Sequence, residues 1–396
     1  MARPFSGYLF IAMLAVSACG DSPIVVDRND DQQAGDTATP TVTPTAASTA
    51  TPTPGGPPVG VPPGSTIRVN GGDYYLLGVN YPWKQYGGDF AGYINSNVSA
   101  ITADFNDMKS KQVHVARWWI FCDGWAGIQY DANGTPTGLS STFFQNMEKG
   151  IQIAKAAKIY LVLTFFDFQF LYKPKSTAHA GGHTNIFTDA AKSTALMNNV
   201  ITPILQQYPN ESTILAWEIM NEPEWVISNL PMPAGEEGTN VDGGSIPITM
   251  AQFFNVASQI STAVHVNTNA YVTIGSAALK WYKVWTNAYA DQKGFPRLNL
   301  DFYQTHYYSW MDPHCLTNDP QLGTVCVSPF KQKYSDLGLD HPMVVGESPS
   351  LTSGQYDTLL SNGYAGIWPW AYINSNINWT TFTAWGNAHS SAVSIP

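Results

Sequence analysis

The stretch FFQNMEKGIQIAKAAKIYLVLTFF, residues 143–166, combines a helix pattern with a strand pattern. In its first half, apolar residues between Phe143 and Ala154 recur at the spacing of one helix face. Its second half, Ile159–Phe166, is apolar at successive rather than alternate positions, as in strands that are buried on both faces. A helix followed directly by such a strand is the repeating unit of a parallel α/β sheet.

Eight strands of this kind alternate with helix patterns along the chain. They are predicted at Tyr74–Tyr81, Val113–Trp119, Ile159–Phe166, Ile214–Met220, Ala270–Gly275, Phe302–Tyr307, Met343–Gly346 and Tyr364–Trp370. Eight rounds within roughly 330 residues favour an α/β fold of the (β/α)8 TIM-barrel type. A doubly wound open sheet is the alternative, but no glycine fingerprint follows any of the strands. Insertions near Pro231–Pro247 and Met311–Phe330 follow the fourth and sixth strands, at the end of a barrel where active sites lie.

The composition favours a neutral ligand. The chain has 396 residues, of which only 12% are charged, and its net charge is −10. Because nucleic acid requires a basic footprint, we expect no nucleic-acid partner. The polar surface consists largely of uncharged side chains, which suit a ligand rich in hydroxyl groups. Aromatic residues reach 13%, and their positions at predicted strand ends and in loops favour a stacking surface over a purely structural core.

The first 18 residues are typical of an export signal. Arg3 supplies a positive start, and Tyr8–Val16 is an apolar run too short to span a bilayer, which needs ~20 residues. The run ends in VSAC, residues 16–19, which resembles a bacterial lipobox with Cys19 as the lipidated residue. An ordinary signal peptide with an incidental cysteine is the alternative. We therefore expect an exported protein in the cell envelope, at the outer membrane or cell surface, attached to the membrane by its lipid anchor alone.

Three segments follow from these patterns: a lipoprotein signal at residues 1–18, a tether at 19–65 and one folded domain at 66–396. The tether is rich in Asp and then in Thr, Pro and Ala, so it can bury no core and is expected to be disordered. We expect the folded domain to be a monomer.

The remaining cysteines suggest one disulfide. Cys315 and Cys326 bracket a short loop and are the best candidates for a pair, because exported proteins tolerate disulfides. Cys122 would then be a free, buried thiol. The spacing of the cysteines is not that of a zinc site, and no histidine-rich cluster completes one. We expect neither a metal nor an organic cofactor.

Two glutamates end predicted strands. In ILAWEIMNEPEW, residues 214–225, Glu222 stands between Asn221, whose amide can hold a sugar hydroxyl, and Pro223, which ends the strand. In HPMVVGESPS, residues 341–350, Glu347 again follows a purely apolar strand. Each strand alone could simply end in a charged turn. Two carboxylates at the ends of separate strands of one barrel can face each other, which is the arrangement that glycoside hydrolysis needs.

From about Tyr74 to Trp370, the chain resembles the (β/α)8 retaining glycosidases, and within them glycoside hydrolase family 5, the cellulase and β-mannanase family. The matching positions are Asn221 and Glu222 in the Asn-Glu pair, Arg117 in VHVARWW, His306 and Tyr308 in THYYSW, and Trp368 in GIWPW.

The resemblance implies a role for each of these residues. Arg117 would hydrogen-bond near the nucleophile Glu347, and Tyr308 would contact that nucleophile. His306 would touch the substrate, and Trp368 would be the platform under the sugar at the cleavage point. Independently, Arg117 lies in an apolar strand, where burial would require Glu347 or Glu218 as a partner. Further tryptophans could line the cleft or belong to the core: Trp83, Trp119, Trp225, Trp310 and Trp370.

One position departs from the family pattern. Many members carry a histidine after the third strand, where this chain has TFFDFQF, residues 164–170. Asp167 is the only polar candidate for that position near the cleaved sugar.

These residues predict a retaining double displacement, with Glu347 as the nucleophile and Glu222 as the acid/base. The expected substrate is a β-linked polysaccharide, with β-mannan placed ahead of β-glucan and xylan on general resemblance. The alternatives are a transglycosidase and a surface polysaccharide-binding lipoprotein that has lost activity. The intact pair of glutamates argues against the second of these.

Overall fold

The computed structural model describes residues 64–174, 180–234, 240–374 and 376–395. The predicted signal at 1–18 and the predicted tether at 19–65 lie outside these ranges, except for the last two tether residues. Ser65 is fully buried, so the folded domain begins by Ser65, one residue ahead of the predicted boundary. In the described ranges, no helix combines the length and the apolar character that crossing a membrane requires.

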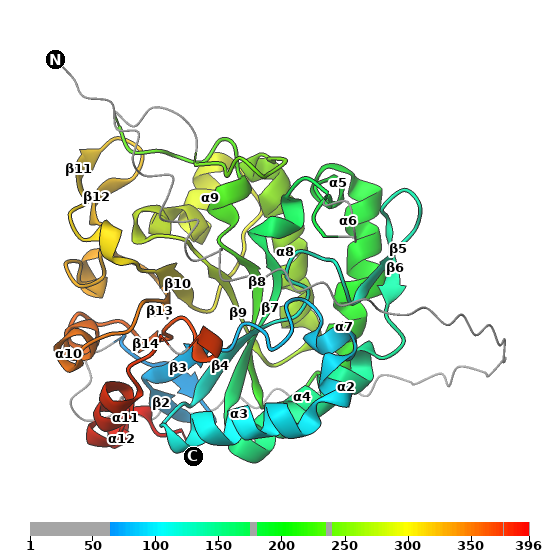
Figure 1. Ribbon diagram of the computed structural model, residues 1–396. Coiled ribbons are helices and arrows are strands. Elements are labelled where there is room, and N and C mark those ends of the chain that lie inside the picture. Colours follow the sequence, from blue (N-terminus) through cyan, green and yellow to red (C-terminus); the bar gives the residue numbers. More distant parts are fainter. Residues whose placement is uncertain (1–63, 175–179, 235–239, 375, 396) are drawn as a thin grey trace. The chain divides into compact units, whose positions relative to one another are not determined.

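The predicted barrel is confirmed, because eight parallel strands run side by side in a nearly closed ring (Figure 1). They are β3 (Leu76–Asn80), β4 (Val115–Trp119), β7 (Tyr160–Asp167), β8 (Ile214–Asn221), β9 (Tyr271–Gly275), β10 (Tyr303–His306), β13 (Met343–Glu347) and β14 (Gly366–Ile367). Each predicted strand overlaps one of them. Hydrogen bonds join them in the order β10-β13-β14-β3-β4-β7-β8-β9. Between β9 and β10, the ring is bridged by backbone bonds from Asp301 to Val272, 2.9 Å, and from His306 to Ser276, 2.8 Å.

Helices follow the strands and cover the outside of the ring (Figure 1). The longer ones are α3 (Val98–Ser110), α4 (Phe143–Ala157), α6 (Ala190–Leu196), α7 (Thr202–Gln207), α8 (Met250–Asn267), α9 (Asn287–Lys293), α10 (Ser353–Ser361) and α11 (Trp379–Ala388). The short ones are α2 (Ile94–Ser96), α5 (Asn185–Thr188) and α12 (Ser390–Val393). In α8, Thr249 and Gln252 form a capping box that satisfies free backbone N–H groups at the helix start.

The side chains inside the barrel form a cluster of their own. Its strand residues include Leu76, Val115, Val162, Ala216 and Val344, and Phe302, which directly precedes β10, belongs to it as well. Ile67 and Val69 belong to the same cluster and come from the hairpin of β1 (Ile67–Val69) and β2 (Gly72–Tyr74). This hairpin therefore closes the end of the barrel at which the strands begin. The open end is the one at which the strands stop, where barrel enzymes build their active sites.

The two predicted insertions lie at the open end and contact each other. The insertion after β10 contains the hairpin of β11 (Cys315–Asp319) and β12 (Gly323–Cys326). The Asp319 carboxylate accepts a 2.6 Å hydrogen bond from the backbone N–H of Ala234, in the insertion after β8. The disulfide between Cys315 and Cys326 is present, and Cys122 is free and buried. Both cysteine predictions are confirmed.

Replacing Cys315 and Cys326 together by serine is expected to destabilise this hairpin. The disulfide closes a loop with a sequence separation of 11 residues. In the loop-entropy relation, such a loop contributes up to about 3 kcal/mol by restricting the unfolded chain. Thermal unfolding of the double variant should therefore start at a lower temperature, while Cys122→Ala serves as the control that leaves the bond intact. Free thiols at Cys315 and Cys326 in the native protein, detected by alkylation without reductant, would contradict the pairing.

Candidate active site

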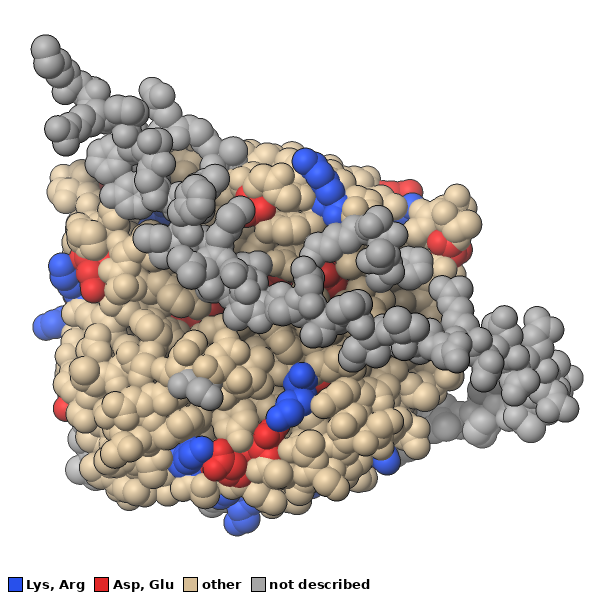
Figure 2. Space-filling model, in the orientation of Figure 1, with Lys and Arg blue, Asp and Glu red and all other residues tan. Residues whose placement is uncertain are grey.

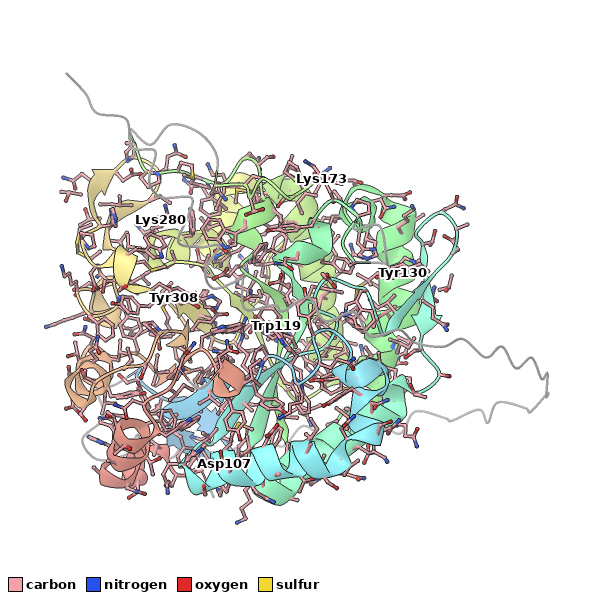
Figure 3. The ribbon with its side chains drawn as sticks, viewed as in Figure 1. Asp107, Trp119, Tyr130, Lys173, Lys280 and Tyr308 are labelled. Atoms are coloured by element: carbon pink, nitrogen blue, oxygen red, sulfur yellow. A yellow bond between two sulfur atoms is a disulfide. The ribbon has the colours of Figure 1, made fainter. Side chains whose placement is uncertain are left out.

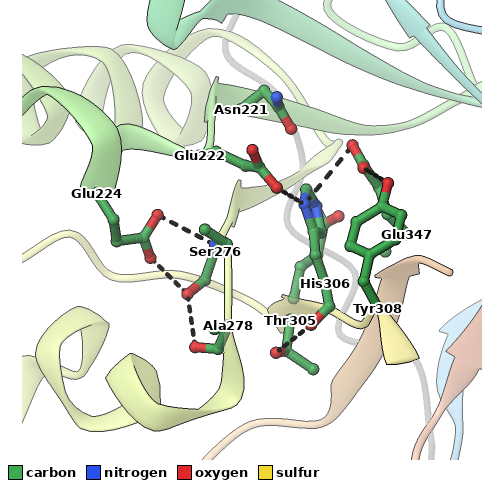
Figure 4. Close-up of polar contacts among 12 residues, drawn as sticks. Asn221, Glu222, Glu224, Ser276, Ala278, Thr305, His306, Tyr308 and Glu347 are labelled. Atoms are coloured by element: carbon green, nitrogen blue, oxygen red, sulfur yellow. Dashed lines mark hydrogen bonds and ion pairs between the residues drawn. The ribbon is translucent and has the colours of Figure 1, made fainter. Parts of the chain in front are cut away.

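Glu222 and Glu347 meet at the open end of the barrel (Figure 4). Glu347 is the last residue of β13, and Glu222 directly follows β8. One oxygen of each carboxyl group and a ring nitrogen of His306 all lie within 4.8 Å of one another. An inverting pair needs about 6.5–9.5 Å to admit a water molecule, whereas a retaining pair is about 5–5.5 Å apart. The separation therefore fits the predicted retaining mechanism.

Glu222 is held in an unusual backbone conformation. Its φ of 46° and ψ of 52° lie in the left-handed region, which non-glycine residues adopt at a cost of about 1–3 kcal/mol. Its backbone N–H donates to Gly275 O at 2.7 Å, and Pro223 then begins the short 3-10 helix Pro223–Val226. This sharp turn between strand and helix directs the carboxyl group into the barrel mouth.

The side chains that hydrogen-bond the Glu222 carboxyl are uncharged. The indole N–H of Trp225 donates to Oε2 at 2.8 Å, and His306 Nδ1 lies 2.7 Å from Oε1. Burial lowers the pKa of His306 to about 4, so the ring is neutral near pH 7. Burial also raises the pKa of Glu222 to about 7, although the Trp225 hydrogen bond opposes the shift. Glu222 can therefore carry the proton that a general acid needs.

Glu347 has charge-stabilising partners instead. Arg117 NH1 donates to its Oε1, and the Tyr308 hydroxyl donates to its Oε2, both at 2.8 Å. Figure 3 labels Tyr308, just after β10. Burial raises the pKa of Glu347, while the nearby Arg117 charge and the Tyr308 hydrogen bond act in the opposite direction. A carboxylate with a guanidinium and a hydroxyl donor is suited to remain ionised and to attack an electrophilic carbon.

Arg117 connects the nucleophile to the strands beside it. Its guanidinium is fully buried and binds Glu218 through two hydrogen bonds, of 2.7 and 2.5 Å. Both carboxylates that the sequence offered as partners, Glu218 and Glu347, are therefore bound. Gly275 leaves the space for this contact, because a Cβ there would lie 2.7 Å from Glu218 and 2.9 Å from Arg117.

His306 lies between the two carboxylates, at 2.7 Å from Glu222 and 3.6 Å from Glu347. The resemblance predicted that it touches substrate, but its side chain has no exposed surface. Its ring instead contacts Oε1 of Glu222, the carboxyl oxygen that Trp225 does not bind. The hydrogen bond from Trp225 to Glu222 was not predicted from the sequence. A spacing of three residues, as within one helical turn, is the signal that could have indicated it.

The comparison with known families agrees with this geometry. A family model described as Cellulase (glycosyl hydrolase family 5) matches residues 75–388.

The chain belongs to glycoside hydrolase family 5.

Two relatives of known name align with most of the length of this family 5 enzyme. A mannan endo-1,4-β-mannosidase of Cryptopygus antarcticus is 25% identical over 342 residues, which are 78% of this chain and 83% of that protein. One of Mytilus edulis is 24% identical over 348 residues, covering 80% of this chain and 88% of that protein. The solved β-1,4-mannanase of Aplysia kurodai has a TM-score of 0.70 at 21% identity, over 84% of this chain and 97% of that one. This last likeness concerns the fold alone.

The family 5 enzyme does not use Trp368 as its platform, so that prediction is wrong. Trp368 is fully buried in the cluster inside the barrel, and its indole N–H donates to Leu76 O at 3.2 Å. Trp368 directly follows β14, but its side chain is directed back into the barrel, where its ring lies against Gly78 and Leu76 of β3. Trp370 is partly exposed and packs against Trp119 with ring centroids 5.5 Å apart. It is the better candidate for the platform.

Substitution of the two tryptophans should separate these roles. Trp370→Ala is expected to lower kcat/KM about tenfold or more, because the stacking of a ligand ring on an aromatic side chain contributes about 1–3 kcal/mol. The melting temperature of this variant should change little. Trp368→Ala should instead cost about 3–5 kcal/mol of folding stability, because it leaves a cavity in the core. Both variants are measured by steady-state kinetics and thermal unfolding. Loss of activity in Trp368→Ala, with activity retained in Trp370→Ala, would contradict this assignment.

The pH profile of kcat/KM should be bell-shaped. The alkaline side falls as Glu222 loses its proton, near its pKa of about 7. On the acidic side, kcat/KM falls as Glu347 becomes protonated. This happens at a higher pH than is usual for a glutamate, because burial raises the pKa of Glu347. Trp225→Phe removes a hydrogen bond that lowers the pKa of Glu222, so the alkaline limb should move to higher pH. An unmoved limb would show that Trp225 does not act on the acid/base.

Proposed function

We propose that this protein is a retaining endo-β-1,4-mannanase. The observation that supports hydrolysis most strongly is the Glu222–Glu347 pair, with oxygens within 4.8 Å and with opposite environments. The substrate assignment rests on the two relatives that cover most of the chain, both named mannan endo-1,4-β-mannosidases. A surface with few charges suits such a neutral polymer, and Figure 2 shows that uncharged residues dominate the visible face.

The reaction follows from the environments of the two carboxyl groups. Glu347, held by Arg117 and Tyr308, attacks the anomeric carbon while Glu222 donates its proton to the leaving glycosidic oxygen. A covalent glycosyl–enzyme ester forms, and the chain on the leaving side departs. Glu222, now ionised, takes a proton from water, and the resulting attack releases a product with the original anomeric configuration.

The test is a panel of defined polysaccharides: linear β-1,4-mannan, galactomannan, β-1,4-glucan and xylan. We expect mannan to be cleaved fastest, with oligosaccharides of mixed length appearing early, as endo action produces. Proton NMR of the first products should show the β-anomer. Faster cleavage of glucan or xylan would overturn the substrate, and early release of a single small product would overturn endo action.

The same panel distinguishes the alternatives. Oligosaccharides that grow longer after their release from the polysaccharide would indicate transglycosylation, in which a sugar replaces water. Binding to mannan without any cleavage would indicate a polysaccharide-binding protein and would overturn the proposed hydrolysis.

We also propose that Cys19 carries a lipid that anchors the protein to a membrane of the cell envelope. Support comes from the VSAC sequence at residues 16–19, in which the short apolar run ends. Cys19→Ala should release the protein from the membrane fraction or block its processing. Unchanged membrane association, with no lipid on the mature N-terminus, would overturn the anchor.

A further inference from the structure

Asp167 is the last residue of β7, at the open end of the barrel. Its side chain is almost completely buried and pairs in register with Asn221 on the neighbouring strand β8. Oδ2 accepts a 2.9 Å hydrogen bond from Asn221 Nδ2. Oδ1 accepts a 2.9 Å hydrogen bond from the backbone N–H of Gln169. The carboxyl group therefore faces the residue that precedes the acid/base.

Asn221 is held at both ends of its amide. Its Oδ1 accepts a 2.7 Å hydrogen bond from Arg117 NH2, and a guanidinium can only donate. The NH2 group must consequently face Asp167. Of its two N–H donors, one is used by Asp167, and no second acceptor for Nδ2 is found among the described residues. The remaining donor is thus fixed in direction by Arg117 on one side and Asp167 on the other.

This donor lies close to the reacting groups. Figure 4 shows the amide of Asn221 beside the carboxyl group of Glu222, and the same Arg117 that binds Asn221 also binds Glu347. In glycosidases, hydrogen bonds to the sugar 2-hydroxyl strengthen as the transition state forms. A donor that is fixed in direction loses no further freedom when that bond forms.

The charge of Asp167 fits this position. Burial, together with the nearby carboxyl of Glu222, raises the pKa of Asp167 to about 8. The group is therefore largely neutral at pH 7 and adds little negative charge beside the catalytic pair. A neutral acid can still accept the Asn221 hydrogen bond through one oxygen.

We propose that Asp167 is a positioning residue, which aims the free N–H of Asn221 at the 2-hydroxyl of the sugar being cleaved. It acts through Asn221 and does not touch the substrate. The inference rests on hydrolysis at the Glu222–Glu347 pair and not on the identity of the polysaccharide.

The test compares Asp167→Ala with the wild type on two aryl β-glycosides that differ only in the 2-hydroxyl of the cleaved sugar. On the substrate with the 2-hydroxyl, kcat should fall about tenfold to a hundredfold with little change in KM, because one directed hydrogen bond is lost in the transition state. On the 2-deoxy substrate, this penalty should disappear. A loss of equal size on both substrates would overturn the proposal.

A double-mutant cycle gives an independent readout. Because Asp167 acts through Asn221, Asp167→Ala should add little to the loss already caused by Asn221→Ala. Additive losses would mean that Asp167 acts by another route. Asp123→Asn is the matched control, as Asp123 is another buried aspartate of this region, and it should leave the 2-hydroxyl dependence unchanged. If Asp167→Ala does not fold, Asp167→Asn replaces it, because the single oxygen of the asparagine amide can still accept one of the two hydrogen bonds. The Asp167→Asn variant should show a smaller loss of kcat that is likewise not additive with the loss in Asn221→Ala.

The substrate assignment is tested separately. If the wild type is inactive on mannosides, the proposed mannanase function fails, and the comparison is made with the aryl glycoside that the enzyme does cleave. The dependence of the Asp167→Ala penalty on the 2-hydroxyl decides the proposal in either case.

Discussion

Glu347→Ala is expected to abolish turnover on every glycoside, by about five to six orders of magnitude in kcat, the loss typical of removing a catalytic nucleophile. No other described carboxylate is both bound by Arg117 at NH1 and placed within 4.8 Å of Glu222. Without it, the covalent intermediate cannot form, whatever the leaving group. Steady-state kinetics on mannan and on an aryl glycoside should show the same loss.

Two variants control for damage to the fold. Glu347→Gln preserves the size of the side chain and should be equally inactive, because an amide does not attack the anomeric carbon. Glu224→Gln changes another buried glutamate nearby, which bonds Ser276 and Trp285 rather than the catalytic pair, and should retain most activity if it folds. Substantial turnover by Glu347→Ala on any substrate would contradict its role as nucleophile.

Glu222→Ala is expected to lose activity in a way that depends on the leaving group. On mannan, kcat should fall by about 10²–10⁴-fold, the usual contribution of general acid–base catalysis. On an aryl glycoside with an acidic phenol, the first step needs little protonation and should stay fast. The glycosyl–enzyme then accumulates, because no base activates water, and a burst of phenol should be visible.

Azide distinguishes the two glutamates. It can attack the accumulated ester in Glu222→Ala without a base, and it should give a glycosyl azide with the original configuration. The alkaline limb of the pH profile should disappear in the same variant, because the group with a pKa of about 7 is gone. If azide instead rescues Glu347→Ala with an inverted product while Glu222→Ala stays inactive, the two roles are reversed.

The sequence predicted much of the fold and site because both depend on local patterns. Apolar runs without alternation marked all eight strands, and short-range spacing marked the helices between them. Glu222 and Glu347 were found because each ends such a strand, and in a closed barrel the ends of parallel strands converge. Arg117 was found because a cation in an apolar strand needs a carboxylate partner.

The failures have a common cause. Trp368 and Trp370 are two residues apart in one motif, and the sequence does not show which reaches the barrel mouth. That depends on how far along the barrel each side chain lies, which is set by the register of β14 against β3 and β13, strands that are far apart in the chain. The hydrogen bond from Asn221 to Asp167 likewise joins neighbouring strands 54 residues apart.

The sequence by itself therefore determined the eight-stranded barrel, the two glutamates and, by resemblance, their roles. The tertiary structure supplied the physical basis of those roles, because the pKa of a buried carboxyl depends on neighbours from other strands. Glu222 faces the neutral groups of Trp225 and His306 and carries a proton near pH 7. Glu347 faces Arg117 and Tyr308, which favour its ionised form. Only folding brings His306, Arg117 and Tyr308, which are far away in the chain, to the two carboxyl groups.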